Sequence, residues 1–286
     1  MSSYEPSCAV GYGGNLCQSC VDVNGTWYSQ TSANICTICP PHSENSLKLF
    51  GIALLILVYF LILVVINIRS VGQKITTVYM RILTNYFQTL TLAQDYNLSW
   101  QGNLSEFLYV ISFLSKADQL IISQDCFIRE TVKHLHPLFV KMAIAFFFPF
   151  IGILAIAVLW SLARLFRKTL DYKNYMVQSI TIFVFVCLPP ITTLTFEIFN
   201  CQDIFGNGQK FLVVDLNVQC WVGDHALYAK LFGVPCLVVW VIGVPFLTFF
   251  MLYKRKTQLN EDFCLKKYGF LYIGLIQDAF YWELVL

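Results

Sequence analysis

The sequence has few charged residues: Asp, Glu, Lys and Arg make up 13% of its 286 residues, against about 25% in an average soluble protein. Its first 46 residues contain no Lys or Arg, and they lack the apolar stretch of a secretory signal peptide. No Gly-rich phosphate loop, nucleophile–base arrangement or basic patch on an aromatic platform is recognisable. We therefore expect no enzyme, no cofactor and no nucleic-acid partner.

Long apolar runs dominate what is present. Hydrophobic residues make up 57% of the chain, and Leu49–Ile66 is a run of eighteen residues without a charged or strongly polar side chain. A hydrocarbon core of roughly 30 Å needs about 20 apolar residues of helix, so such a run predicts a membrane span. Three later stretches match it, and these four predicted spans are 47–68, 138–163, 176–199 and 227–253.

A further candidate span, 75–96, is interrupted by polar side chains. Arg81, Asn85 and Gln88 follow a helical spacing and would form one polar stripe. Such a stripe suits either a helix in the membrane interface or a span that faces the interior of a bundle, because polar groups are costly against lipid. Glu197, inside the span 176–199, is expected to face inward for the same reason.

The distribution of Lys and Arg decides between these alternatives. If the N-terminal head lies outside and all five segments span, the cytoplasmic segments hold twelve cationic residues and the outer segments hold four. A cytoplasmic excess of Lys and Arg is the known determinant of orientation. The sequence therefore predicts an all-α, five-span helical bundle in the plasma membrane, with an extracellular N-terminus and with the residues after the fifth span in the cytoplasm.

Three glycosylation sequons give a separate indication of orientation. They begin at Asn24, Asn97 and Asn103, and all three fall on the side that the charge distribution makes external. The prediction is a glycoprotein with its head outside the cell.

The head carries five cysteines: Cys8, Cys17, Cys20, Cys36 and Cys39. The last four have the C-x2-C-x15-C-x2-C spacing of a zinc ribbon, a reading that applies in the cytosol. Disulfides are the alternative, since fewer than 50 residues bury little surface and need covalent links or a metal. A cytosolic head would also put twelve cations outside, so we predict disulfides.

The remaining cysteines divide by position. Cys126, Cys201 and Cys220 fall in outer loops, and we expect a Cys201–Cys220 disulfide, which leaves Cys126 without a partner that we can name. Cys187 and Cys236 fall inside spans and are expected to be packed thiols. Cys264 is expected to be a free cytoplasmic thiol.

Several motifs together resemble a known architecture. The loop from Cys8 to Cys17 with its Gly-Tyr-Gly-Gly core, followed by Cys20, Cys36 and Cys39, resembles the EGF-like, ephrin-receptor-like cysteine module. In large surface proteins of ciliates and other protists, such modules precede a polytopic region related to fungal TRP-like proteins. The membrane part is similar as well, at Ile82–Gln88, Asp125–Phe127, Phe199–Cys201, Asp215 with Cys220, Ile242–Pro245, Tyr268–Tyr272 and Tyr281–Glu283.

Both ends suggest a fragment of a longer protein. An odd number of head cysteines is expected if one partner lies upstream of residue 1, and Tyr281–Leu286 looks like the start of a sixth span with an aromatic anchor. The predicted domains are a cysteine-rich extracellular module at 1–46 and a polytopic transmembrane domain at 47–286.

Few residues suggest a binding or permeation site. His134, His136 and His225 are the best metal candidates, but they lack a second cluster of ligands, so we predict no metal site. Helix breaks are expected in two spans, since Pro cannot donate to the helix ladder and Gly loosens it. The residues concerned are Pro189, Pro190, Gly243 and Pro245.

Two functions remain. The resemblance implies a receptor-like surface protein whose disulfide-rich ectodomain binds an extracellular protein or glycan while the helices lie in the lipid bilayer. Broken spans with inward polar groups instead suggest a TRP-like ion channel or transporter subunit that passes an ion.

Overall fold

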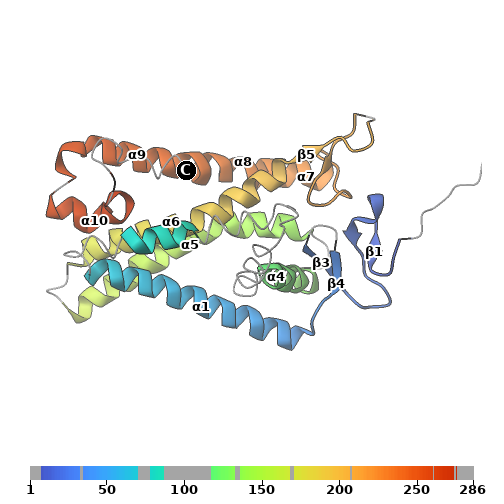
Figure 1. Ribbon diagram of the computed structural model, residues 1–286, viewed down its shortest axis with the longest axis horizontal. Coiled ribbons are helices and arrows are strands. Elements are labelled where there is room, and N and C mark those ends of the chain that lie inside the picture. The colour runs from blue at the N-terminus through green and yellow to red at the C-terminus, as the bar shows by residue number, and fades with distance from the viewer. Residues whose placement is uncertain are drawn as a thin grey trace, which may run out of the picture. The chain divides into compact units, whose positions relative to one another are not determined.

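The computed structural model describes residues 8–32, 35–69, 78–86, 117–132, 136–167, 171–206, 208–259, 261–273 and 275 (Figure 1). Within these ranges the chain is mainly helical. The helices are α1 (His42–Arg69), α4 (Ala117–Thr131), α5 (Pro137–Phe166), α6 (Tyr172–Phe199), α7 (Gly223–Tyr228), α8 (Val234–Cys236), α9 (Val244–Lys254) and α10 (Asp262–Tyr272). Residues 78–86 are also helical.

In the part of the chain that the structure describes, short strands form three antiparallel pairs. These are β1 (Tyr12–Gly13) with β2 (Ser19–Cys20), β3 (Tyr28–Ser32) with β4 (Ile35–Ile38), and β5 (Cys201–Gln202) with β6 (Phe211–Leu212). In register, Tyr12 lies opposite Cys20 and Cys201 opposite Leu212. Isolated two-stranded pairs are marginally stable in water, so these hairpins depend on other links.

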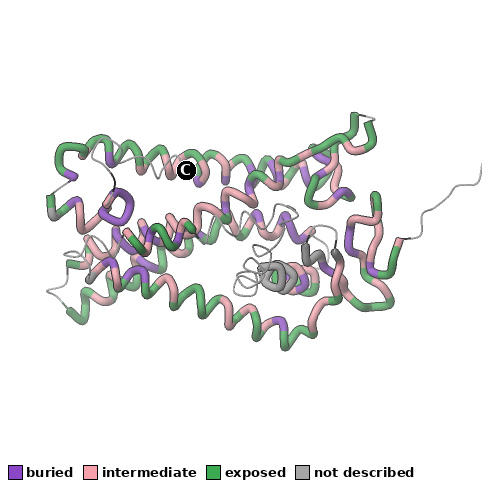
Figure 2. Tube along the Cα trace, viewed as in Figure 1, coloured by how far each residue is buried: buried purple, intermediate pink, exposed green. Residues whose placement is uncertain are grey.

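Within the described ranges, four helical segments are long and apolar enough to cross a membrane: His42–Ile68, Pro137–Phe166, Tyr172–Phe199 and Gly223–Lys254. They match four of the five predicted spans. Only 11% to 22% of the residues in their most apolar windows are buried, and exposed residues follow the helices along much of their length (Figure 2). Helices that expose apolar side chains this extensively are stable against lipid, where their backbone groups are satisfied internally. The protein is thus an integral, multi-pass membrane protein.

The fifth predicted span, 75–96, lies largely outside the described residues. Its described part, 78–86, is helical. Gln88, Asn97, Asn103, His134 and the expected start of a further span near residue 281 also lie outside the described part of the chain.

The prolines do not interrupt their helix. α6 continues through Pro189 and Pro190 as one 28-residue helix, which differs from the expected break. The hydroxyls of Thr192 and Thr195 donate to the carbonyl oxygens of Leu188 and Ile191, one turn earlier. Such side-chain bonds and local adjustments let membrane helices accommodate proline.

The segment around Gly243 does depart from α-helical geometry. Two π-helical stretches, η3 (Ala229–Gly233) and η4 (Leu237–Gly243), alternate with α8 and lead into α9. The wide turns end at Gly233 and Gly243, and Pro235 and Pro245 each stand two residues later. Helical structure persists here, but with i to i+5 hydrogen bonding.

The chain divides into two compact units. The first, which we call the disulfide-rich unit, comprises Met1–Leu54, Thr89–Val140 and Glu197–Ala229. The second, the helical unit, comprises Leu55–Gln88, Lys141–Phe196 and Lys230–Leu286. The head thus shares one unit with the two loops that the charge distribution made external, and the division into domains at residue 46 stays a prediction.

The helical unit has its own buried core. Leu63 of α1, Ile182 of α6, Leu252 of α9 and Phe270 of α10 are almost completely buried in one cluster. In the same unit Gly152 of α5 lies against the ring of Phe183, where a larger residue would collide. Close approach at small residues is how membrane helices gain packing energy.

Candidate functional site

Four disulfides cross-link the disulfide-rich unit. They join Cys8 to Cys17, Cys20 to Cys36, Cys39 to Cys126, and Cys201 to Cys220. The predicted Cys201–Cys220 bond is present, and all eight candidate cysteines are paired. The zinc-ribbon alternative is not realised, because each of its four cysteines is oxidised.

The partner of Cys39 corrects one expectation. The sequence predicts that one of the five head cysteines has its partner upstream of residue 1, and it names no partner for Cys126. Instead Cys39 bonds to Cys126 of α4, 87 positions later. The head has an odd number of cysteines because one of its disulfides links it to a distant segment of the chain.

The three thiols outside this unit are not oxidised. Cys187 in α6 is half-buried, Cys236 in α8 is buried, and Cys264 in α10 is buried as well. The two span thiols are packed as expected. Cys264 is free but 1% exposed, so it is far less accessible than a solvent-facing thiol.

Asp215 is the centre of a polar cluster between three parts of the disulfide-rich unit. The Ser19 hydroxyl of β2 donates to Asp215 Oδ1 at 2.6 Å, and the Asn217 backbone N–H donates to the same oxygen at 3.0 Å. His136 Nε2, next to the start of α5, lies 2.7 Å from Asp215 Oδ2. One carboxylate therefore holds the head, the 201–220 loop and the start of a span.

The position of His136 follows from its local role. Its Nδ1 accepts a hydrogen bond of 3.3 Å from the Leu138 backbone N–H, one of the donors that the first turn of a helix leaves unsatisfied. Nδ1 is thus an acceptor, and the ring proton lies on Nε2, from which it donates to Asp215. Pro137 suits the first position of α5, since it has no N–H to satisfy.

These contacts lower the pKa of the Asp215 carboxyl group. Desolvation by burial is the largest single influence and raises the pKa of Asp215. The hydrogen bonds from His136, Ser19 and Asn217 outweigh it and lower the pKa from 3.8 to about 2. The side chain of Asp215 is 15% exposed, so its charge is held in a partly desolvated place.

The geometry of the Asp215 cluster suits a structural link between segments better than a catalytic site. In a nucleophilic triad the histidine stands between the hydroxyl and the carboxylate and takes the proton of the hydroxyl. Here the carboxylate stands between Ser19 and His136, so the serine proton is already committed to Asp215. The geometry supports a structural clamp and offers no activated nucleophile.

Further hydrogen bonds hold the head against the same loop and α4. Asn15 donates from its backbone to Asn217 Oδ1 and from its side chain to the Leu216 carbonyl oxygen, at 3.0 and 2.8 Å. Arg129 of α4 donates to the carbonyl oxygens of Cys20 and Tyr28, each at 3.2 Å. Together with Cys39–Cys126, these bonds fix the head on two separate segments of the chain.

One group of potential metal ligands occurs among the described residues: Cys201, Cys220 and His225. The two sulfurs form a disulfide and offer no thiolate. His225 Nδ1 accepts from the Trp221 N–H at 3.0 Å, and Nε2 lies 2.9 Å from the Ile198 carbonyl oxygen. His225 is 1% exposed, and both of its ring nitrogens are occupied, so it joins the start of α7 to the end of α6.

The intramembrane polar candidates are placed differently. Arg81, 2% exposed, donates to the Phe270 carbonyl oxygen of α10 at 3.1 Å, and nearby Thr84 lies 2.7 Å from the Tyr59 hydroxyl of α1. Asn85 and Glu197 are half-buried. Within the helical unit, the buried polar groups of Arg81 and Thr84 thus bond to other segments.

Comparisons with known proteins give one similarity. The chain is 30% identical over 128 residues to cysteine repeat modular protein A of Toxoplasma gondii. The matched region covers 43% of this chain and 4% of that protein, so the chain spans a small part of its relative's length. No protein-family model matches the chain, and no solved structure matches it. The likeness agrees with a cysteine-rich protist protein and assigns no activity.

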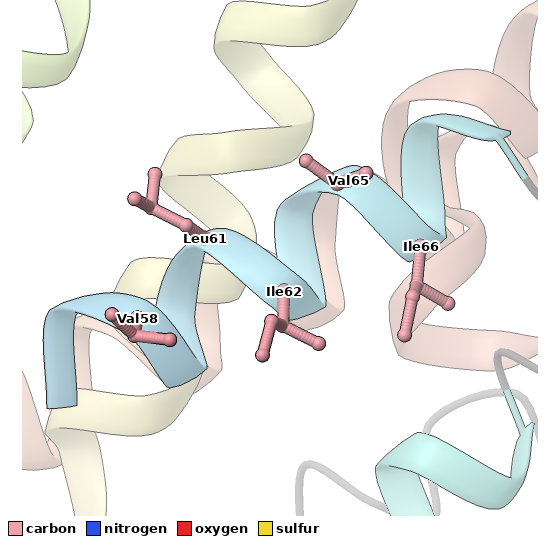
Figure 3. A pocket seen from close by; sticks show the side chains of 5 residues that line it. All are labelled: Val58, Leu61, Ile62, Val65 and Ile66. Atoms are coloured by element: carbon pink, nitrogen blue, oxygen red, sulfur yellow. The ribbon is translucent and has the colours of Figure 1, made fainter. Parts of the chain in front are cut away.

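A shallow apolar hollow lies on α1 in the helical unit. Its lining residues are Val58, Leu61, Ile62, Val65 and Ile66, and Figure 3 shows their side chains projecting from this one helix. The lining side chains contain only carbon, so the hollow offers no polar group to orient a soluble ligand. In a bilayer such a surface contacts lipid chains.

Proposed function

We propose that the protein is a receptor-like surface protein of the plasma membrane, in which the disulfide-rich unit lies outside the cell and binds a protein or glycan. Four disulfides support an oxidising compartment, since thiols stay reduced in the cytosol. The similarity to a cysteine repeat modular protein agrees with this role.

The Cys39–Cys126 bond carries the proposed topology. Cys39 directly precedes α1 and Cys126 lies in α4, before α5. A disulfide needs both residues on one side of the membrane, so the chain crosses an even number of times between them. α1 supplies one crossing, and the predicted span 75–96 supplies the return. This arrangement keeps the excess of Lys and Arg on the cytoplasmic side, as orientation requires.

The attachment of the head supports a receptor. The head is joined to the start of α1 through the chain, to α4 by a disulfide, and to the start of α5 through Asp215 and His136. Binding that shifts the head would therefore act on the first turn of a membrane helix. A head on a flexible tether would lack such a connection.

We expect the full chain, tagged and inserted in lipid nanodiscs, to bind saturably to intact cells, with empty nanodiscs as the control. Glycosidase treatment of the target cells separates a glycan partner from a protein partner. Mild reduction of the disulfides should abolish the binding, because short hairpins lose their order without cross-links. Signal no higher than that of empty nanodiscs on every cell type tested would contradict the receptor proposal.

Glycosylation tests the orientation. Asn24 lies in an exposed turn between Val23 and Thr26, where an enzyme can reach it. In a glycosylating eukaryotic host, Thr26→Ala should remove one glycan from the protein, whereas Thr26→Ser keeps the sequon and should leave the mass unchanged. Identical mobility of both variants and the parent, before and after glycosidase, would place the head on the other side.

A TRP-like channel or transporter subunit is the second candidate. It is favoured by the π-helical turns of η3 and η4, because such turns often occur at functional sites. The continuous course of α6 through its two prolines removes part of the original reason for this candidate. Ion flux through reconstituted protein distinguishes it from a receptor.

A further inference from the structure

A cluster of basic residues follows the last described span. Lys254 ends α9, Arg255 and Lys256 follow, and Lys266 and Lys267 lie in α10. We call these five residues the basic elbow. Only Glu261 and Asp262 are acidic between residues 254 and 267, so the segment carries a local excess of positive charge.

Packing fixes the shape of the basic elbow. Phe270 and Leu271 of α10 are buried in the same core as Leu63 of α1 and Leu252 of α9. The Tyr272 hydroxyl donates to the Leu259 carbonyl oxygen at 2.6 Å, which joins α10 to the connection that precedes it. α10 is therefore anchored by its apolar residues beside the end of α9 (Figure 1).

Aromatic rings position three of the cations. Arg255 donates to the Tyr268 hydroxyl at 3.0 Å, and its guanidinium carbon lies 5.3 Å from the centre of that ring. Lys267 Nζ lies 3.8 Å from the Phe263 ring centre, and Lys256 Nζ lies 5.1 Å from that of Tyr253. Cation–π contacts hold a charge without neutralising it.

No acidic side chain that the structure describes forms an ion pair with the basic elbow. Lys254 and Lys256 are exposed, while Arg255, Lys266 and Lys267 are half-buried. By contrast Lys48, at the start of α1, is paired with Glu44 at 2.7 Å. The basic elbow is thus a pre-formed group of cations whose anionic partner is not supplied by the described residues.

We propose that the basic elbow binds the phosphate-bearing headgroup of an anionic phospholipid. The candidate span Gly223–Lys254 ends at its first residue, which puts the cations at the depth of lipid headgroups. Tyr253 and Phe263 are 52% and 48% exposed, as suits aromatic side chains in the membrane interface. The guanidinium of Arg255 adds the planar donor geometry that matches a phosphate. The inference rests on the proposed membrane topology.

The test uses the full chain in phosphatidylcholine bilayers with a trace of spin-labelled phosphatidic acid or spin-labelled phosphatidylcholine. The motion-restricted fraction of each label gives its relative association constant. We expect phosphatidic acid to be preferred. Since each cation near an anionic headgroup contributes about fivefold, Lys256→Gln with Lys267→Gln should lower this preference by up to about 25-fold.

Two controls keep the result interpretable. Lys48→Gln with Lys210→Gln removes the same charge from the disulfide-rich unit and should leave the preference unchanged. Lys254→Gln with Lys266→Gln repeats the test on the other two lysines, and an unchanged thermal unfolding midpoint verifies that each variant is folded.

Three outcomes would overturn the proposal. The first is equal association of both lipids with the wild-type protein, and the second is full preference in both elbow variants. The third is displacement of the lipid by inorganic phosphate at constant ionic strength, which would show a site for a free anion. Each can occur while Asn24 is glycosylated and the chain binds cells, so failure here is distinct from failure of the proposed receptor function.

Discussion

Replacing Cys39 and Cys126 with serine should destabilise the disulfide-rich unit by about 4–5 kcal/mol. This disulfide closes a segment of 87 residues, and the entropy that a cross-link removes from the unfolded chain grows with the length of the closed segment. The variant should also free the head from α4, leaving Asp215, Asn15 and Arg129 to hold it. We expect faster tryptic cleavage after Arg129 and Lys48 in nanodiscs, because local opening exposes both sites.

The matched control is Cys201→Ser with Cys220→Ser. That disulfide closes 19 residues, so its loss should cost about 3 kcal/mol on the same entropic argument. A smaller effect for the Cys39–Cys126 variant than for this control would show that the head does not depend on its link to α4. Cleavage unchanged in both variants would show that neither bond limits opening.

Substituting Asp215 with asparagine should destabilise the same unit by about 2–3 kcal/mol at neutral pH. The pKa of Asp215 is lowered from 3.8 to about 2, and each unit of difference between the folded and unfolded states corresponds to about 1.4 kcal/mol. The asparagine amide can still accept from Ser19 and the Asn217 N–H. Its NH2 group, however, would face the Nε2 proton of His136, and two donors cannot bond to each other.

The same group predicts the acid dependence. Because the folded-state pKa lies below the unfolded value, the contribution of Asp215 is fully present above about pH 5 and is lost as the pH falls towards 2. The thermal unfolding midpoint of the wild-type protein, followed by tryptophan fluorescence in nanodiscs, should therefore drop more steeply in acid than that of Asp215→Asn.

Ser19→Ala is the graded control, since it removes one of three hydrogen bonds and should cost about 1 kcal/mol. It should keep most of the acid dependence because His136 still faces the carboxylate. Parallel pH curves for the wild-type protein and Asp215→Asn would show that another group governs the acid transition.

The spans could be predicted because their physical cause is local. Eighteen or more apolar residues in sequence satisfy the bilayer on their own, and the helices at 42–68, 137–166, 172–199 and 223–254 appear where the runs predict them. The predicted interruption of the helix at Pro189 and Pro190 was wrong, because the helix continues through both residues. The helix-breaking effect of proline in soluble proteins therefore does not carry over to this 28-residue membrane helix.

The disulfides show where local information ends. Cys201 and Cys220 flank one loop, so their pairing could be predicted from the chain between them. Cys39 and Cys126 are separated by a membrane span and by 87 positions. Spacing in the sequence does not indicate which residues come together after the chain has crossed the membrane. The expected upstream partner was wrong for this reason.

The Asp215 cluster had only a weak signal in the sequence. Asp215 belongs to a motif with Cys220, and His136 is one of the metal candidates. Ser19 belongs to no motif that the sequence analysis identifies. Nothing in their spacing indicates that these three residues meet, since His136 lies 79 positions from Asp215 and Ser19 lies 196 positions from it.

The sequence by itself determined that the chain is an integral membrane protein with a cysteine-rich head, because hydrophobic length and cysteine content act through composition and near neighbours. Only the tertiary structure decided how that head is attached. A disulfide to α4, a carboxylate shared by Ser19 and His136, and the packing of α10 beside the end of α9 all depend on contacts between distant segments. Those contacts form only after the spans have returned the chain to the same place.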